Sequence, residues 1–179
     1  MSQAPDIPGA EFSRLIEVEV LGTEPVERSI EASETERLAL ARRFGLLSLD
    51  RLEARIEVQR EAGRRVRAAG RFEAELQQRC VVSLVPVKSR IAARFVTVYS
   101  DDPAVEDEPI DWNDDEDIEP YENGTIDLGE GVAQQLAVRI DPYPRAPGAA
   151  VPEGYQAIGE AEQAAGSPFD ELSSLHKRN

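Results

Sequence analysis

A formal net charge of −15 over 179 residues, from 35 Asp and Glu against 20 Lys and Arg, argues against a chain that binds nucleic acid with its whole surface. Hydrophobic residues make up 41% of the sequence and charged residues 31%, which is typical of one globular domain with tails. A lone cysteine excludes an intrachain disulfide and a zinc site of several thiolates. The sequence has no signal-peptide pattern and no apolar run of ~20 residues, so we expect a soluble cytoplasmic protein with no membrane contact.

The first elements in chain order are a flexible N-terminus and two short strands. Residues 1–11 carry no periodic pattern. Apolar residues then alternate from Phe12 to Val20, which predicts a strand that Gly22 ends. A second short strand is expected over Val26–Ile30.

A capping box predicts the first helix. Ser33 and Glu36 have the S-x-x-E spacing in which each side chain accepts a hydrogen bond from the backbone N–H of the other residue. Gly45 suits the left-handed position that follows a helix. We therefore expect a helix over residues 34–44.

Three long runs with a period of two residues follow the helix. They cover Leu49–Arg60, Val66–Gln78 and Val87–Tyr99, and short connections join them. Alternation of apolar and charged residues is typical of antiparallel strands that pack one face on a core. The runs predict an antiparallel β-meander, or a barrel-like sheet.

A second helix is expected over about Gly129–Ile140. Its apolar residues recur every fourth position, which places them on one face: Leu128, Val132, Leu136 and Ile140. Pro142 and Pro144 end it. Residues 145–167 are rich in Ala, Gly, Pro and Glu and are expected to be disordered, and Ser167-Pro168 predicts a short terminal helix.

These elements predict an α+β fold with an antiparallel sheet and two packing helices. The expected organisation is a flexible N-terminus (1–11), one α+β domain (12–145) with an acidic loop (100–124), and a flexible tail (146–179) with a short terminal helix.

The acidic loop belongs to the most unusual stretch of the sequence, Asp101 to Glu130. It holds fourteen carboxylates and no Lys or Arg, whereas residues 11–100 hold sixteen basic and fourteen acidic side chains. Such a dense run of like charges cannot be buried unpaired. It is expected to be solvated unless a cation or a basic partner meets it.

One register of this stretch resembles a calcium loop. Oxygen-bearing side chains fall on its ligand positions: Asp111, Asn113, Asp115, Asp117 and Glu122. Glu116, however, occupies the position where the sharp turn requires Gly, and no amphipathic helix precedes the loop because Pro103 and Pro109 interrupt the chain. A calcium-binding protein is therefore the least favoured alternative, and no metal or cofactor is expected.

Nothing in the sequence predicts an enzyme. The only histidine, His176, is the fourth residue from the C-terminus and lies in a tail expected to be flexible, whereas a catalytic pair needs a rigid, oriented base. Cys80 ends an apolar-facing strand, so a small buried hydrophobe is favoured over a reactive thiol.

Basic residues concentrate around the hairpin between the first two long runs. Arg64, Arg65 and Arg67 are candidate RNA contacts there, with further cations on neighbouring strands. Interleaved glutamates such as Glu61 and Glu73 give the competing interpretation, a neutralised and solvated face.

Several segments together resemble a known family. They are Gly70–Val87 with the Arg79-Cys80 element, the acidic stretch, Thr125–Glu130, Asp141–Arg145 and the tail Ser167–Leu175. In this order they resemble the YceD family of large ribosomal RNA subunit accumulation proteins, in the form common in alphaproteobacteria, over about residues 12–145. Many members carry further cysteines near this element, and because this chain has no second cysteine the resemblance implies no metal-bound form. The family also has no established catalytic residues that could be assigned to this sequence.

The resemblance implies a role in 23S rRNA accumulation and maturation of the large ribosomal subunit. We expect a non-enzymatic factor whose acidic surface contacts a basic ribosomal protein or assembly factor, so that 23S rRNA is reached indirectly. The candidate partner-binding residues are Asp111, Asp114, Asp115, Glu116, Asp117 and Glu119. The alternative is a module that binds rRNA directly through the Arg-rich face of the sheet.

Overall fold

The computed structural model describes residues 10–61, 64–102 and 118–150. The expectations for the N-terminus, for most of the acidic loop and for the terminal helix fall on residues 1–9, 103–117 and 151–179, which lie outside this part. The chain divides into two units, Met1–Ala146 and Pro147–Asn179. Every helix and strand of the described residues belongs to the first unit.

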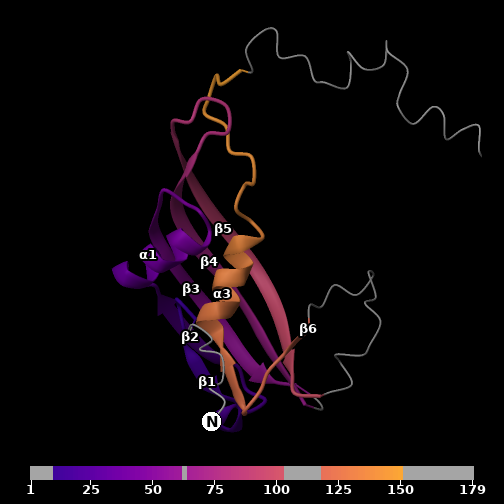
Figure 1. The fold of residues 1–179 in the computed structure, drawn as a ribbon. Helices are drawn as coiled ribbons and strands as arrows, with labels where there is room; N and C mark the ends of the chain where they lie inside the picture. The colour runs from indigo at the N-terminus through magenta and orange to yellow at the C-terminus, as the bar shows by residue number, and fades with distance from the viewer. Residues whose placement is uncertain (1–9, 62–63, 103–117, 151–179) are drawn as a thin grey trace, which may run out of the picture. The chain divides into compact units, whose positions relative to one another are not determined.

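A five-stranded sheet in the order β2-β3-β4-β5-β6 forms the body of this unit (Figure 1). Its strands are β2 (Val26–Glu31), β3 (Ser48–Arg60), β4 (Arg65–Arg79), β5 (Pro86–Ser100) and β6 (Ile118–Pro120). The first four run antiparallel to their neighbours, whereas β6 runs parallel to β5. The three long alternating runs therefore form the predicted meander, and the α+β class is confirmed.

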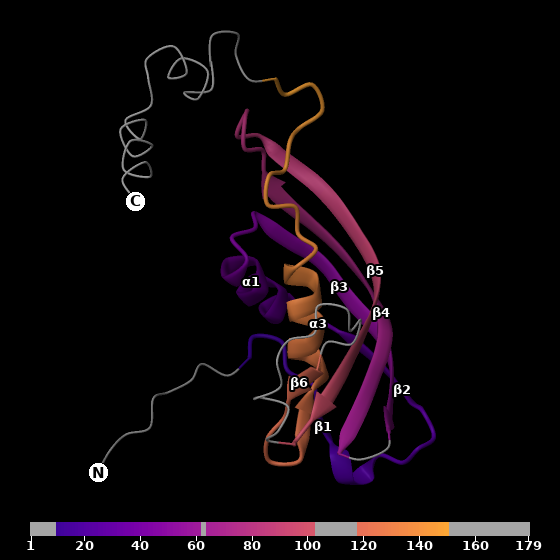
Figure 2. The same cartoon turned by 90° about the vertical axis from the view of Figure 1, so that its right-hand side faces the viewer.

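The sheet is open, so the barrel-like alternative is wrong. The edge strands β2 and β6 each pair with a single neighbour, β3 and β5 respectively. Helices instead fill the concave side of the curved sheet (Figure 2). Since they cover the apolar face, no closure of the strands is needed to bury it.

The expected strand over Phe12–Val20 is shorter and pairs elsewhere. Only β1 (Leu15–Glu17) is extended, and a 3₁₀ turn (Val18–Val20) follows it. β1 pairs antiparallel with β7 (Thr125–Asp127) in a separate two-stranded ladder. Alternation predicted an extended segment, but it carries no information about a partner more than 100 residues away in the chain.

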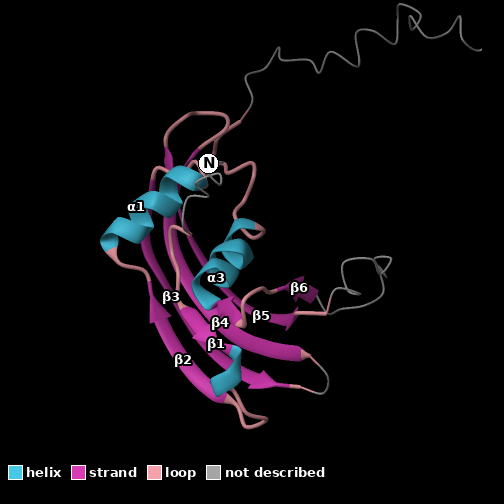
Figure 3. Ribbon diagram, turned by 60° about the horizontal axis from the view of Figure 1, so that its bottom comes forward, coloured by secondary structure: helices cyan, strands magenta, loops and turns pink. Residues whose placement is uncertain are grey.

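Two helices pack on one face of the sheet, as expected (Figures 2 and 3). They are α1 (Glu34–Arg43) and α3 (Leu128–Ala137). The predicted stripe of α3 is largely buried, since Val132 and Leu136 have no exposed surface, and Ile140 packs against the core beyond the end of the helix. None of the described helices is long and apolar enough to cross a membrane.

The core lies between this helix layer and the inner face of the sheet. Alternate residues of β3 and β4, among them Leu52, Ile56 and Phe72, are at most 1% exposed and join Leu40 of α1 and Leu136 of α3 in one cluster. The residues between them in sequence point to the opposite face, which we call the outer face. No described helix or strand covers that face (Figure 2).

Candidate functional site

Both ends of the acidic loop lie at one edge of the sheet. The chain leaves β5 at Ser100 and returns in β6 at Ile118, and the parallel register pairs Val98 with Ile118 and Ser100 with Pro120. Of the six predicted partner-binding residues, the structure describes only Glu119, in β6. The other five, Asp111, Asp114, Asp115, Glu116 and Asp117, lie outside the described residues.

An acidic hollow adjoins this edge. It has a volume of about 320 Å³ and lies between β6, β7 and α3. Four carboxylate residues line it: Glu119, Glu122, Asp127 and Glu130. The described residues that line it include no Lys or Arg. The negative character of the sequence after Asp101 therefore continues into the ordered surface next to β6.

Two of these carboxylates also hold the fold together. Asp127 is the N-cap of α3, and its Oδ1 accepts hydrogen bonds from the backbone N–H groups of Gly129 and Glu130, at 3.0 and 3.2 Å. Glu130 accepts two hydrogen bonds from the Arg43 guanidinium of α1, at 2.8 and 2.7 Å. A ligand of the hollow would therefore meet mainly Glu119 and Glu122.

Glu119 faces a polar side chain of α3. With its amide nitrogen turned toward Glu119, Gln134 lies 2.9 and 3.1 Å from the two carboxylate oxygens. Because Gln134 is neutral, this contact orients the carboxylate without adding a positive charge to the hollow. Glu122 is exposed at the turn before β7. Glu119 and Glu122 thus add two carboxylates to the lining of the hollow.

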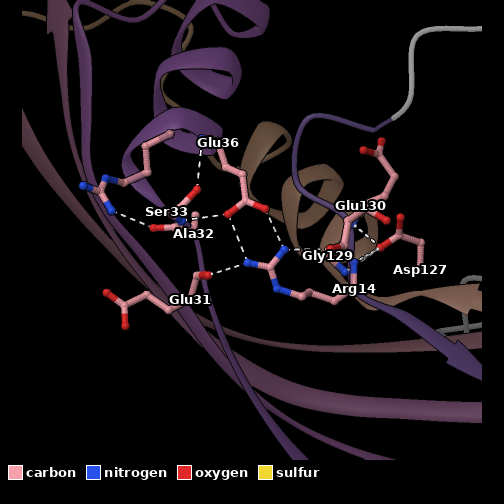
Figure 4. Close-up of polar contacts among 10 residues, drawn as sticks. Arg14, Glu31, Ala32, Ser33, Glu36, Asp127, Gly129 and Glu130 are labelled. Atoms are coloured by element: carbon pink, nitrogen blue, oxygen red, sulfur yellow. Dashed lines mark hydrogen bonds and ion pairs between the residues drawn. The ribbon is translucent and has the colours of Figure 1, made fainter.

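Arg14 joins the N-terminal segment to both helices (Figure 4). Its guanidinium donates to both carboxylate oxygens of Glu36 in α1, at 2.6 and 3.0 Å, and to the Glu31 carbonyl at 2.8 Å. Its backbone N–H donates to Asp127 Oδ1 at 2.7 Å. The sequence showed the capping box, which the structure confirms, but no local pattern pointed to Arg14 as its third member.

The predicted basic and acidic sites meet at the end of the β3–β4 hairpin. Arg64 donates to both carboxylate oxygens of Asp101, at 2.8 and 2.9 Å, and these hydrogen bonds lower the pKa of Asp101. Arg67 lies 3.6 Å from Glu61. Arg65 is exposed opposite Ser100 and makes no ion pair in the described part of the chain. Two of the three candidate RNA contacts are thus already matched by carboxylates.

Cys80 is fully buried, as expected for a small core residue. Its Sγ accepts hydrogen bonds from the backbone N–H groups of Ser83 and Ala146, both at 3.3 Å. Hydrogen bonds from the Ser83 side chain and backbone, and from Ala146, lower the pKa of the thiol to about 6. The sulfur fixes the turn after β4 against the segment after α3.

No cluster of metal-ligating side chains occurs within residues 10–61, 64–102 and 118–150. The calcium-loop register, residues 111–122, falls mostly outside these ranges, so that alternative stays an untested prediction.

Comparison with known proteins places the chain in a family. No curated protein and no solved structure matches the chain. The model of the family described as large ribosomal RNA subunit accumulation protein YceD matches residues 68–176, more than half of the sequence. The match starts in β4, later than the resemblance suggested, and runs on past the second helix. The chain belongs to the YceD family, which is linked to accumulation of the large ribosomal subunit rRNA.

Proposed function

We propose that this protein is a non-enzymatic factor of large-subunit biogenesis that acts by holding a basic ribosomal protein or assembly factor on its acidic surface. The observation that carries the proposal is the hollow beside β6, which four carboxylates line and to which no described Lys or Arg contributes. It continues the acidic loop, whose two ends lie at the same edge of the sheet. We place this activity in the cytoplasm, in a protein of the alphaproteobacterial form that the arrangement of its motifs resembles.

The physical basis is electrostatic. A surface of one sign steers a partner of opposite sign and speeds the encounter, while a salt concentration near 0.15 M limits the reach of each charge to about 8 Å. While the partner is held, the carboxylates take the place of RNA phosphates on its cations. Such a factor would keep a basic protein from contacting rRNA too early.

A pull-down with two matched variants tests this proposal. In the first variant the six predicted residues Asp111, Asp114, Asp115, Glu116, Asp117 and Glu119 are changed to Asn or Gln. In the control, six exposed glutamates elsewhere are changed to Gln: Glu17, Glu19, Glu24, Glu27, Glu31 and Glu34. Both variants lose the same number of negative charges.

Wild type and control are expected to retain basic large-subunit proteins, identified by mass spectrometry, and the first variant is expected to lose them. Equal recovery with all three proteins would show that the acidic surface is not the contact.

Direct rRNA contact through Arg64, Arg65 and Arg67 remains the second candidate. Phosphates would have to displace Asp101 from Arg64 and Glu61 from Arg67, so only Arg65 is ready to bind. Replacing the three arginines by Ala should weaken binding to 23S fragments and make its salt dependence shallower. Absence of binding by the wild type at low salt would dispose of this candidate.

A further inference from the structure

The outer face carries cations, and carboxylates of the described residues neutralise only some of them. β5 contains Lys88, Arg90 and Arg94 and no carboxylate over its whole length. All three are exposed, and their even numbering places them on the outer face. β4 adds Arg71 and Arg79 on the same face. We call these five residues the cationic stripe.

Only two carboxylates interrupt the stripe, and both are occupied. Glu73 accepts a hydrogen bond from Arg90 at 2.6 Å. Glu75 lies 3.9 Å from Arg51 of β3, outside the stripe. Arg71, Lys88 and Arg94 have no ion pair within the described residues. A net positive surface therefore exists on a chain whose overall charge is −15.

The register of the strands places like charges side by side. Arg71 is directly opposite Arg94 on β5 and directly opposite Arg55 on β3. Like charges in directly opposed positions destabilise a sheet. Glu73 offsets part of this repulsion through its electrostatic interaction with Arg71. An anion on the face between the arginines would offset more of it.

The hollow next to these arginines is lined by three cations, Arg55, Arg71 and Arg94, by two carboxylates, Glu27 and Glu57, and by small apolar residues. It has a volume of about 530 Å³, and Ala69 and Val96, which pair with each other, lie one step along the face from Arg71 and Arg94. Val96 is 38% exposed. A ribose or base has room here beside the guanidinium groups.

We infer that the cationic stripe binds the phosphate backbone of single-stranded RNA. Alternate residues of a strand stand ~6.6 Å apart, on the scale of the spacing between successive phosphates along an extended nucleic acid strand. On β5, Lys88 and Arg90 stand one such step apart, and Arg90 and Arg94 stand two steps apart. Cations at these spacings on an uncovered face follow a backbone without reading its sequence. This goes beyond the proposed protein contact, which uses other residues.

An acidic peptide added as a strand to the edge of β5 is the competing ligand. Such a peptide would lie beside β5 in the plane of the sheet and would not reach Arg71 and Arg79 on β4. Arg139 also donates to the Arg94 carbonyl at 3.3 Å, so part of the edge backbone is occupied. Cations on two adjacent strands favour a ligand that lies across the face.

Fluorescence anisotropy of a labelled uridine oligonucleotide of about 20 residues, with the full chain at about 50 mM salt, tests the inference. The stripe variant combines Arg71→Gln, Lys88→Gln and Arg94→Gln. The control combines Arg28→Gln, Arg42→Gln and Arg60→Gln, three exposed arginines off the stripe that make no ion pair among the described residues. Both variants have the same net charge.

The stripe variant is expected to lose at least about tenfold in affinity and to flatten the slope of log K against log salt by about 2, since each phosphate contact on a single strand contributes ~0.7. The control should bind like the wild type. If the stripe variant fails to fold in a thermal melt, Ala92→Glu, which puts a carboxylate at an exposed position between Arg90 and Arg94, should give the same loss.

Three results would overturn the inference: no RNA binding by the wild type, an equal loss in both triple variants, or binding of polyglutamate that needs Lys88 but not Arg71. The last would identify an acidic strand at the β5 edge. The result is separate from the pull-down, because neutralising the six acidic residues leaves every cation of the stripe in place.

Discussion

At the residue scale, Arg14 and Glu36 form the contact that ties the N-terminal segment to the helix layer. The Glu36 carboxylate accepts from Arg14 and also from the Ser33 backbone N–H at 2.7 Å, which completes the capping box of α1. The hydrogen bond from Arg14, followed by those from Ser33, lowers the pKa of Glu36 from 4.5 to about 2. One carboxylate thus serves both the helix start and the tertiary structure.

Glu36→Gln should lower the free energy of unfolding at pH 7 by about 1 kcal/mol, because a partly exposed charge-assisted pair is lost. A carboxyl with a lowered pKa in the folded state stabilises above its unfolded value of 4.5 and loses this effect as the pH falls toward 2. The difference between variant and wild type should therefore shrink from pH 7 to pH 2 in urea titrations.

The control is Glu34→Gln, in the same first turn but exposed and without a tertiary partner among the described residues. It should cost about 0.3 kcal/mol through the helix dipole alone. A Glu36→Gln effect that stays constant across the pH range would contradict the lowered pKa.

Cys80 allows a second prediction at this scale. Hydrogen bonds from Ser83 and Ala146 lower its pKa, but its full burial keeps reagents from the sulfur. Reaction with Ellman's reagent should be orders of magnitude slower in the folded protein than in urea, and limited by local opening. A fast reaction of the folded protein would show that the thiol is accessible and reactive.

At the element scale, hydrophobic periodicity predicted the elements but not their partners. The three long strands followed from alternation, the second helix from the stripe at every fourth residue, and the first helix from its capping box. The pairing of β1 with β7 could not be predicted, because a three-residue strand has too few side chains to specify a register. β6 was missed because its residues, Ile118–Pro120, follow directly on a run of carboxylates.

The candidate site was predictable to a similar degree. Composition alone identified the acidic stretch and placed Glu119 in it. The contribution of Glu130 and Gln134 depends on how α3 lies beside β6, which no local pattern encodes. Likewise, the cationic stripe depends on the register of β4 against β5.

Gly129 sets the approach of α3 to the N-terminal segment. A Cβ atom there would lie 2.5 Å from the Phe12 carbonyl oxygen and 3.0 Å from the Arg14 backbone nitrogen, and backbone atoms cannot easily move. Gly129→Ala should therefore destabilise the protein by about 2 kcal/mol, although Ala is the better helix former by about 1 kcal/mol.

Urea unfolding measures the effect, with Ala137→Gly at an exposed position of the same helix as the control for propensity alone. Stabilisation by Gly129→Ala would show that the close packing of α3 on this segment is absent in solution.

At the scale of the whole molecule, the charges are sorted rather than mixed. Carboxylates line the hollow beside β6, and the cationic stripe lies on the outer face of β4 and β5. A basic protein and an RNA strand can therefore be attracted to different parts of one chain whose net charge is −15. The electric field of the acidic surface also acts on a ligand of the cationic stripe, and the field of the stripe acts on a ligand of the acidic surface.

That field gives the last prediction. Neutralising the six acidic residues removes part of the long-range repulsion between the chain and RNA, so oligonucleotide affinity at about 50 mM salt should rise by about two- to fivefold. Neutralising the six control glutamates should raise it by a similar or greater factor, because both variants lose the same charge and Glu27 of the control set also lines the hollow beside the stripe. The gain should shrink as salt rises to about 0.2 M, where screening shortens the reach of every charge. A much larger gain in the first variant alone, measured by the same anisotropy titration, would mean that the acidic residues compete directly with RNA for the cationic stripe, and the two surfaces would then act as one switch rather than as two independent contacts.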